Sequence, residues 1–183
     1  ETDVGSWFAA RKKSGREADF SDQRIISLKT ALEYLKSFSG VIYIELKCGN
    51  EDFALLSEAV CGVVAANRSD GRIILKSFKL ASIIEIRRHI AEIAAAALFD
   101  AGIMKMIRSE EFLPALAAEF GANELSIHYS LATPKLAAAA RRVNMPITIW
   151  TVDSPRWVAK AADVGIAAII TNNPAKLIAA RRA

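Results

Sequence analysis

Glu45 and Lys47 close the segment VIYIELK, residues 41–47, whose other residues are mostly strand formers. Side chains alternate between the two faces of a β-strand, so these two charged residues share one face with Tyr43, and the aliphatic residues share the other. A carboxylate at a strand end can bind a divalent cation, and a nearby ammonium can neutralise an anionic substrate. The pair could also be an ion pair that lines a filled interior, and this segment does not decide between the two interpretations.

Trp150 and the turn from Thr171 to Pro174 are two further candidates for a binding site. Trp150 lies near the carboxyl end of a predicted strand in PITIWTVDSP, residues 146–155, where its ring could form a pocket wall or belong to the core. In GIAAIITNNPAKL, residues 165–177, a predicted strand turns into a helix. Such a turn can present backbone N–H groups to a phosphate, or it can be an ordinary helix cap.

Short β-branched segments alternate with longer Ala-rich or amphipathic segments from residue 25 onward. This rhythm predicts strands at residues 41–47, 71–78, 95–100, 124–129, 147–152 and 166–171. It predicts helices at residues 27–38, 52–67, 80–93, 109–121, 133–144, 154–165 and 173–182. Ser27, Thr133 and Ser154 are predicted N-caps, and Gly121 is a predicted helix stop. Six strands that are each followed by a helix require parallel pairing, because each helix is a crossover.

Two parallel architectures fit this order of elements, an open doubly wound sheet and a closed (β/α)8 barrel. No Gly-rich phosphate loop follows any predicted strand, which removes the main sequence support for a nucleotide-binding open sheet. A barrel has eight strands and typically about 250 residues, whereas this chain has 183 residues and supplies six strands. In a barrel, Glu45 and Lys47 would face the interior near the carboxyl ends of the strands, where barrel active sites form.

The composition narrows the class of protein further. With 52% hydrophobic and 24% charged residues, residues 1–183 are predicted to form one domain. The net charge of +4 comes from basic residues interleaved with acidic ones, so nucleic-acid binding is not indicated. The apolar runs are shorter than the roughly 20 residues of a membrane span, so no membrane segment is expected. Cys48 and Cys61 lack metal-ligand spacing and are predicted to be reduced thiols, which favours the cytoplasm. A periplasmic or secreted location stays open, because the sequence begins at Glu1 without an initiator.

Several motifs, in register over nearly the whole chain, resemble the glycerophosphodiester phosphodiesterase family. YIELK is similar to the family's Glu-Leu-Lys strand, ILKSF to its Ser-Phe strand end, and ITIWTVDSP to its Trp-Thr-Val-Asn turn. GIAAIITNNP resembles its closing strand with Thr-Asp-x-Pro, and DVGSWF its Gly-Ser-Trp-Phe loop. RIISLKTALEYL is similar to its Ile-Pro-Thr-Leu-Glu-Glu-x-Leu helix entry, with Ile26 in place of the proline. Asn172 stands where the family usually has Asp, and Asp153 where it usually has Asn, so the contacts of these loops are open to question.

This resemblance implies a (β/α)8 TIM barrel of the phospholipase-C-like phosphodiesterase type, with about six of its eight βα units present. It implies hydrolysis of glycerophosphodiesters to glycerol 3-phosphate and an alcohol, as part of lipid metabolism, with Mg²⁺ or Ca²⁺ as the cofactor. By the same resemblance, Glu45 is a metal-binding carboxylate, Lys47 is a catalytic contact to the substrate or transition state, and Trp150 binds the substrate as a pocket wall.

The family's catalytic His-Arg-Gly strand, its Glu-x-Asp metal ligands and its second catalytic His-Asp would all precede Glu1, and they would account for the two missing strands. His89, on a predicted outer helix, and His128, near a strand end, do not replace them. We therefore expect this chain alone to be inactive. Two alternatives remain: a non-catalytic barrel-derived module for binding or assembly, which could form a homo-oligomer through open sheet edges, and an unrelated open-sheet α/β protein.

Overall fold

The computed structural model describes residues 22–67 and 71–182. The chain divides into two compact units, Glu1–Phe38 and Ser39–Ala183. The sheet lies entirely within the second unit, and the prediction of one barrel domain over residues 1–183 stays a prediction. The DVGSWF motif and most of the predicted amino-terminal loop lie outside the described residues.

The described part of the first unit contains one helix, α2 (Leu28–Tyr34). Its predicted N-cap is confirmed, because the Ser27 hydroxyl accepts a hydrogen bond of 3.1 Å from the backbone N–H of Thr30. The side chain then satisfies one of the N–H groups that the first helical turn leaves without a partner. The helix ends at Tyr34, four residues before the predicted end.

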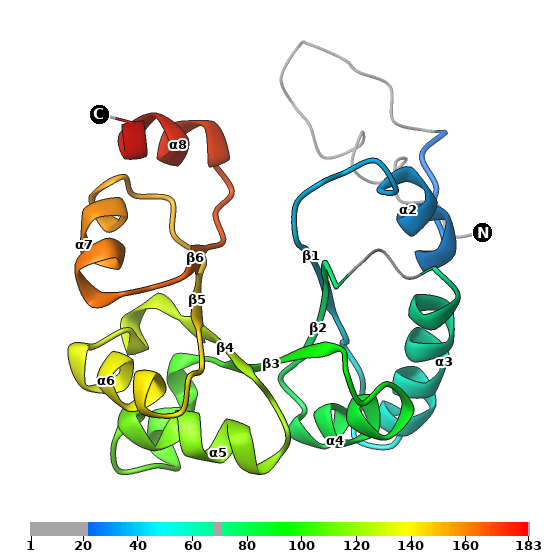
Figure 1. Cartoon of the computed structure of the whole chain (residues 1–183), viewed down its shortest axis with the longest axis horizontal. Helices are drawn as coiled ribbons and strands as arrows, with labels where there is room; N and C mark the ends of the chain where they lie inside the picture. The colour runs from blue at the N-terminus through cyan, green and yellow to red at the C-terminus, as the bar shows by residue number, and fades with distance from the viewer. Residues whose placement is uncertain (1–21, 68–70, 183) are drawn as a thin grey trace. The chain divides into compact units, whose positions relative to one another are not determined.

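Six parallel strands form one sheet in the second unit, and they pair in chain order (Figure 1). The strands are β1 (Ile42–Glu45), β2 (Ile73–Ser77), β3 (Ala94–Phe99), β4 (Glu124–His128), β5 (Ile147–Trp150) and β6 (Ala168–Ile169). All six predicted strands are therefore confirmed, although β6 has only two residues in strand geometry.

Helices follow the strands and lie on the outer side of the sheet (Figure 1). They are α3 (Phe53–Ala66), α4 (Leu80–His89), α5 (Leu113–Glu119), α6 (Pro134–Arg142), α7 (Arg156–Val164) and α8 (Pro174–Arg182). Short 3₁₀ turns, η1 (Ala101–Lys105), η2 (Glu110–Phe112) and η3 (Tyr129–Leu131), complete the connections. None of the helices in the described ranges has both the length and the apolar character that a membrane crossing needs.

Of the three other predicted signals at helix ends, two are confirmed and one is wrong. The Thr133 hydroxyl accepts a hydrogen bond of 3.2 Å from the Leu136 N–H, directly before Pro134 at the first turn of α6. Gly121 adopts the left-handed conformation with φ +84°, which a glycine reaches without strain, just after α5. Ser154 is not the cap of α7, because that helix begins one residue later than the predicted cap requires and has no side-chain cap.

The strand register fixes which side chains face the interior of the curved sheet. Glu45 pairs with Lys76, Lys76 with Ala96, and Ala96 with Glu124, so these four residues share one face. The opposite face is aliphatic and packs under the helices, where Leu75, Ile83, Ile86, Leu125, Ile127 and Ile149 are fully buried. Burying side chains of this size supplies most of the stability of such a layer, at about 1.5–3 kcal/mol each.

The sheet curls so strongly that β1 reaches β4 and β5 across the interior. The hydroxyl of Tyr43 on β1 donates a hydrogen bond of 2.9 Å to Glu124 on β4 and lies 3.3 Å from the Thr148 hydroxyl on β5. A flat six-stranded parallel sheet would hold β1 and β4 about 14 Å apart. The fold is therefore an α/β architecture of a partial TIM barrel, with six of the eight βα units.

Candidate active site

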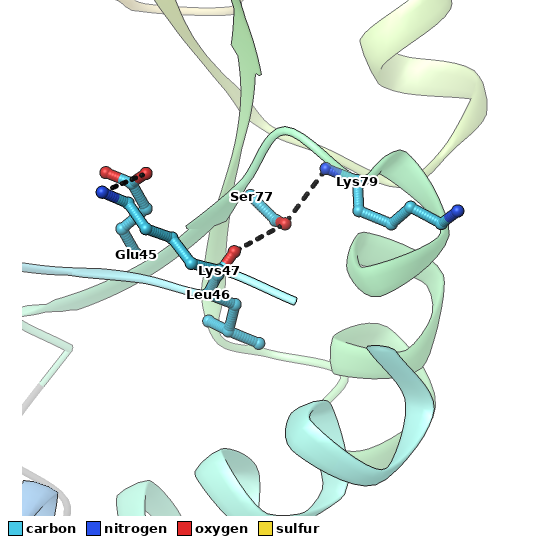
Figure 2. Close-up of polar contacts among 5 residues, drawn as sticks. All are labelled: Glu45, Leu46, Lys47, Ser77 and Lys79. Carbon is cyan, nitrogen blue, oxygen red and sulfur yellow. Dashed lines mark hydrogen bonds and ion pairs between the residues drawn. The ribbon is translucent and has the colours of Figure 1, made fainter. Parts of the chain in front are cut away.

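The carboxyl ends of β1 and β2 are tied together by one buried hydroxyl group (Figure 2). Ser77 donates a hydrogen bond of 3.0 Å to the carbonyl of Leu46, and its oxygen accepts one of 3.1 Å from the backbone N–H of Lys79. This link joins the end of β1, the end of β2 and the start of α4. It therefore holds the backbone on either side of Leu46, where Glu45 and Lys47 are attached.

Glu45, Lys47 and Trp150 line one cavity of about 250 Å³ at the carboxyl ends of the strands. The remaining lining residues are Lys76, Phe78, Leu98, Thr151 and Ile170. The three candidates thus lie around one cavity, as predicted. Their chemical roles stay predictions. A neighbouring cavity of about 460 Å³ shares Glu45 and Lys47 and extends to Cys48 and Lys79.

Glu45 and Lys47 also interact directly, with 3.7 Å between the Lys47 Nζ and a Glu45 carboxylate oxygen (Figure 2). The Lys47 side chain is 81% exposed and that of Glu45 is 28% exposed. Ion pairs this open to solvent contribute little to stability, about 0–1 kcal/mol. The mutual ion pair that the sequence allowed is thus present, and its exposure leaves the Lys47 ammonium available to a ligand.

Trp150 is part of an aromatic wall at the same end of the sheet. Its ring meets Phe78 and His128 edge-on, each at 5.6 Å between centroids. The Tyr129 ring lies 4.4 Å from the His128 ring and 5.3 Å from the Trp157 ring, measured between centroids. These contacts extend the wall to α7. The indole Nε1 of Trp150 is buried and has no hydrogen-bond partner among residues 22–67 and 71–182, so the ring carries a donor that these residues do not satisfy.

Below the cavity, Glu124 is the centre of a buried polar network that sequence reasoning missed. Its carboxylate accepts hydrogen bonds from Tyr43, at 2.9 Å, and from the Thr148 hydroxyl, at 2.7 Å. Burial raises the pKa of Glu124, although the bonds from Thr148 and Tyr43 and the charge of Lys76 oppose that rise. The signal in the sequence was the position of Glu124 on the inward face of a strand, which is unusual for a charged residue.

The turn after β6 is closed by Asp153, which belongs to the loop after β5. Its carboxylate accepts hydrogen bonds from the Thr171 hydroxyl at 2.9 Å, the Asn172 backbone N–H at 2.8 Å and the Asn172 side-chain amide at 3.0 Å. The next backbone N–H, that of Asn173, donates to the Thr171 hydroxyl. These N–H groups are therefore occupied, and the turn is an ordinary helix cap rather than a phosphate site.

The model of the glycerophosphoryl diester phosphodiesterase family matches residues 8–176. The chain belongs to this family. Over 159 residues it is 23% identical to the glycerophosphodiester phosphodiesterase of Caldanaerobacter subterraneus subsp. tengcongensis, a match that covers 87% of this chain and 63% of the relative.

Solved structures of the phosphodiesterase class share the fold. One is a phosphodiesterase of Oleispira antarctica in complex with the product sn-glycerol-3-phosphate, with a TM-score of 0.78, 16% identity, and coverage of 90% of this chain and 64% of that one. Another is a glycerophosphodiester phosphodiesterase of Parabacteroides distasonis, with a TM-score of 0.69, 19% identity, and coverage of 85% and 63%. This chain thus spans less than two thirds of the length of each of these relatives.

The described residues do not make the metal site that the family resemblance implies. Glu45 is the one carboxylate among the residues that line the cavity. Within residues 22–67 and 71–182, no three His, Cys, Asp or Glu side chains are grouped so that they could hold a metal ion. Mg²⁺ and Ca²⁺ need six or more oxygen ligands, so a single carboxylate does not fix either ion.

Neither histidine of this family member lines the cavity. His89 is exposed at the end of α4, as predicted. His128 lies at the strand end beside Trp150, but its Nδ1 is 2.7 Å from the Ser130 hydroxyl and it is absent from the cavity lining. A catalytic role for either ring receives no support from this arrangement.

Proposed function

We propose that this chain binds glycerophosphodiesters in the cavity between Glu45, Lys47 and Trp150 and takes part in their hydrolysis to glycerol 3-phosphate and an alcohol. The observation that carries the proposal is the convergence of an available ammonium, a carboxylate and an indole ring on one cavity at the carboxyl ends of the strands. Active sites of TIM barrels form at this end. The relative of Oleispira antarctica, solved with sn-glycerol-3-phosphate, supports the same class of ligand.

The residue roles in this proposal follow from charge and exposure. Lys47 is the exposed cation, so it contacts the phosphate and offsets the negative charge that grows on the phosphoryl oxygens. Glu45, 3.7 Å away, orients that ammonium when no ligand is bound. Trp150 presents a flat apolar ring to the glycerol backbone, and Phe78 fixes the ring from its edge.

A role for Mg²⁺ or Ca²⁺ rests on the family resemblance alone. Glu45 is the candidate ligand in the described part of the chain, and none of the binding steps above depends on a metal ion. A location in the cytoplasm likewise stays a proposal from the sequence.

The second candidate function is a non-catalytic binding module. The placement of both histidines favours it, since His89 lies at the exposed end of α4 and His128 is hydrogen-bonded beside the wall rather than facing the cavity. Under this alternative the cavity still binds the ligand, but no general acid or base in the described residues protonates the leaving alcohol.

Binding of glycerophosphocholine by residues 1–183 tests the proposed site, and turnover, which we do not expect of this chain alone, would remove the non-catalytic alternative. We would measure binding by isothermal titration calorimetry and turnover by release of glycerol 3-phosphate. Lys47→Met should weaken binding by about 10-fold or more, the usual cost of a lost charged contact. Lys135→Met removes the same charge from the exposed surface of α6 and is the control. Equal binding by wild type and Lys47→Met would remove the proposed site.

A further inference from the structure

Lys76 is a buried lysine that the proposed function does not use. It is the fourth residue of β2 and pairs in register with Glu45 on β1 and Ala96 on β3, so its side chain faces the interior of the sheet. It is only 7% exposed. Lysine is rarely buried to this extent unless its ammonium is paired.

No hydrogen bond or close ion pair satisfies the Lys76 ammonium within the described ranges. Its nearest favourable contact is the ring of Tyr43, with 5.4 Å from Nζ to the centroid. Burial lowers the pKa of Lys76, while the charges of Glu45 and Glu124 act in the opposite direction. The carboxylates thus attract the ammonium from a distance without occupying its three donors.

Lys76 borders the cavity on one side and a small residue on the other. Ala96, the register partner on β3, places only a methyl group between Lys76 and Glu124. Lys76 itself lines the cavity of about 250 Å³, together with Lys47 and Glu45. Two ammonium groups and one carboxylate are the charged groups of that lining, so the cavity has an excess of positive charge.

A second donor in this cavity also has no partner. The Trp150 Nε1 is buried and makes no hydrogen bond, and Trp150 lines the same cavity as Lys76. A buried donor without a partner is costly unless a ligand satisfies it, and the Lys76 ammonium, which is not among the fully buried atoms, keeps access to a ligand. A compact anion with several acceptor oxygens matches this set.

We propose that Lys76 and the Trp150 Nε1 form the inner half of a phosphate-binding subsite, in which they contact a phosphate group from the barrel interior while Lys47 contacts it from the exposed rim. The inference rests on the proposed function for the identity of the anion. It adds a second cation to the site and gives the Trp150 ring a hydrogen-bonding role besides its apolar one. With two ammonium groups, the subsite favours the dianionic phosphate monoester over the singly charged diester.

The experiment is a titration of residues 1–183 with inorganic phosphate and with sn-glycerol-3-phosphate, followed by calorimetry and by NMR of the Trp150 indole N–H and the Lys76 ammonium. Lys76→Met keeps most of the side chain's length and removes its charge, and Lys76→Arg restores a cation. Lys135→Met on the exposed surface of α6 is the matched control. Thermal unfolding of each variant is recorded alongside.

We expect Lys76→Met to weaken phosphate binding by about 10-fold or more, Lys76→Arg to retain binding within about 3-fold, and Lys135→Met to match wild type. In wild type, phosphate should shift both NMR signals. Unchanged signals, no binding of either anion, or equal binding by Lys76→Met and wild type would each overturn the subsite. Because the NMR signals are read in wild type, a variant that fails to fold leaves the decision intact.

The outcome is separable from that of the proposed function. If glycerophosphocholine binds in a manner that depends on Lys47 but not on Lys76, the subsite is wrong and the proposed function stands. If phosphate binds through Lys76 while glycerophosphocholine neither binds nor is hydrolysed, the subsite stands and the proposed function falls.

Discussion

Asp153 and Asn172 are joined by two hydrogen bonds, in which the Asp153 carboxylate accepts from both the backbone N–H and the side-chain amide of Asn172. In the family pattern that this chain resembles, the loop after β5 usually carries Asn and the turn after β6 usually carries Asp. The two residue types are exchanged here, and the exchanged residues contact each other. The loop contacts that the sequence left open to question are therefore made by a reciprocal pair.

A double exchange tests this pairing. Asp153→Asn should lower the thermal midpoint, because the neutral amide oxygen is a weaker acceptor for three donors that now share a carboxylate. Asp153→Asn combined with Asn172→Asp should recover part of the loss, since a carboxylate and an amide again face each other. Differential scanning calorimetry of the single and double variants checks this. A double variant less stable than both single variants would show that the two positions do not act as a pair.

The raised pKa of Glu124 should make the stability of the protein depend on pH. Its pKa lies above the ordinary value of 4.5 because of burial, so the folded chain holds the proton more tightly than the unfolded chain does. The stability gained in this way is complete below the ordinary pKa and is lost as the pH rises through the raised pKa. Glu124→Gln can still accept hydrogen bonds from Tyr43 and Thr148 through its amide oxygen, but it does not ionise.

The free energy of unfolding of Glu124→Gln minus that of wild type should therefore be larger at about pH 8 than at about pH 4, which means that the variant is relatively more stable at high pH. Urea unfolding at several pH values measures this difference. Glu119→Gln, which removes the same charge from the exposed surface of α5, is the control and should show a smaller trend. A relative stability of Glu124→Gln that does not change with pH would show that the carboxyl group is not destabilised when it ionises.

Loss of the Ser77 hydroxyl should lower the stability of the protein. Ser77→Ala removes the acceptor for the Lys79 N–H and the donor to the Leu46 carbonyl, in a position that is 1% exposed. Loss of a buried hydroxyl with two partners should lower the free energy of unfolding by about 1–3 kcal/mol. Ser154→Ala, at an exposed position before α7, should change it by less than about 0.5 kcal/mol. Equal losses in the two variants, measured by urea unfolding, would contradict the role assigned to the Ser77 link.

The sequence was most informative where a local pattern carries the structure. The period of two in residues 41–47 was enough to place Glu45 and Lys47 on the inward face, because side chains of a strand must alternate. It could not reveal the Tyr43–Glu124 contact, which joins residues 81 positions apart and depends on how far the sheet curls. Lys76 escaped notice for the same reason, since one lysine in an apolar strand does not show that it faces a cavity.

The ends of elements were less predictable, and Arg87 shows why. The predicted helix at residues 80–93 ends at His89, and Arg87 then donates hydrogen bonds to the carbonyls of Ala91, Ile93 and Gly121. In the sequence, Arg87 fits the pattern of a helix that continues, but its side chain binds the carbonyls of the loops instead. The local periodicity of the sequence does not predict contacts of this kind between a helix and a distant loop.

The catalytic competence of the chain can be tested directly. We expect residues 1–183 to show no metal-dependent hydrolysis of glycerophosphocholine or of a chromogenic phosphodiester, because Glu45 is the one carboxylate of the described cavity lining and both histidines lie elsewhere. The measurement is release of glycerol 3-phosphate with added Mg²⁺ or Ca²⁺. Turnover that Glu45→Gln abolishes would show that the catalytic groups are complete in this chain and that the prediction is wrong.

The outer edge of β1 predicts self-association. In β1 the N–H of Ile42 bonds to the Arg72 carbonyl, and just after it the N–H of Leu46 bonds to the Lys76 carbonyl. In a parallel strand alternate N–H groups point to opposite sides, so those of Val41, Tyr43 and Glu45 point away from β2. No other strand in the described ranges pairs with that side, and a free strand edge is a template for pairing with a second copy.

Sedimentation equilibrium over a concentration series should therefore show reversible association of residues 1–183. Val41→Pro removes one outward N–H at an exposed position just before β1 and should weaken association, whereas Val41→Thr keeps that N–H and should not. A wild-type chain that stays monomeric throughout, or equal association of the two variants, would mean that copies do not pair through this edge.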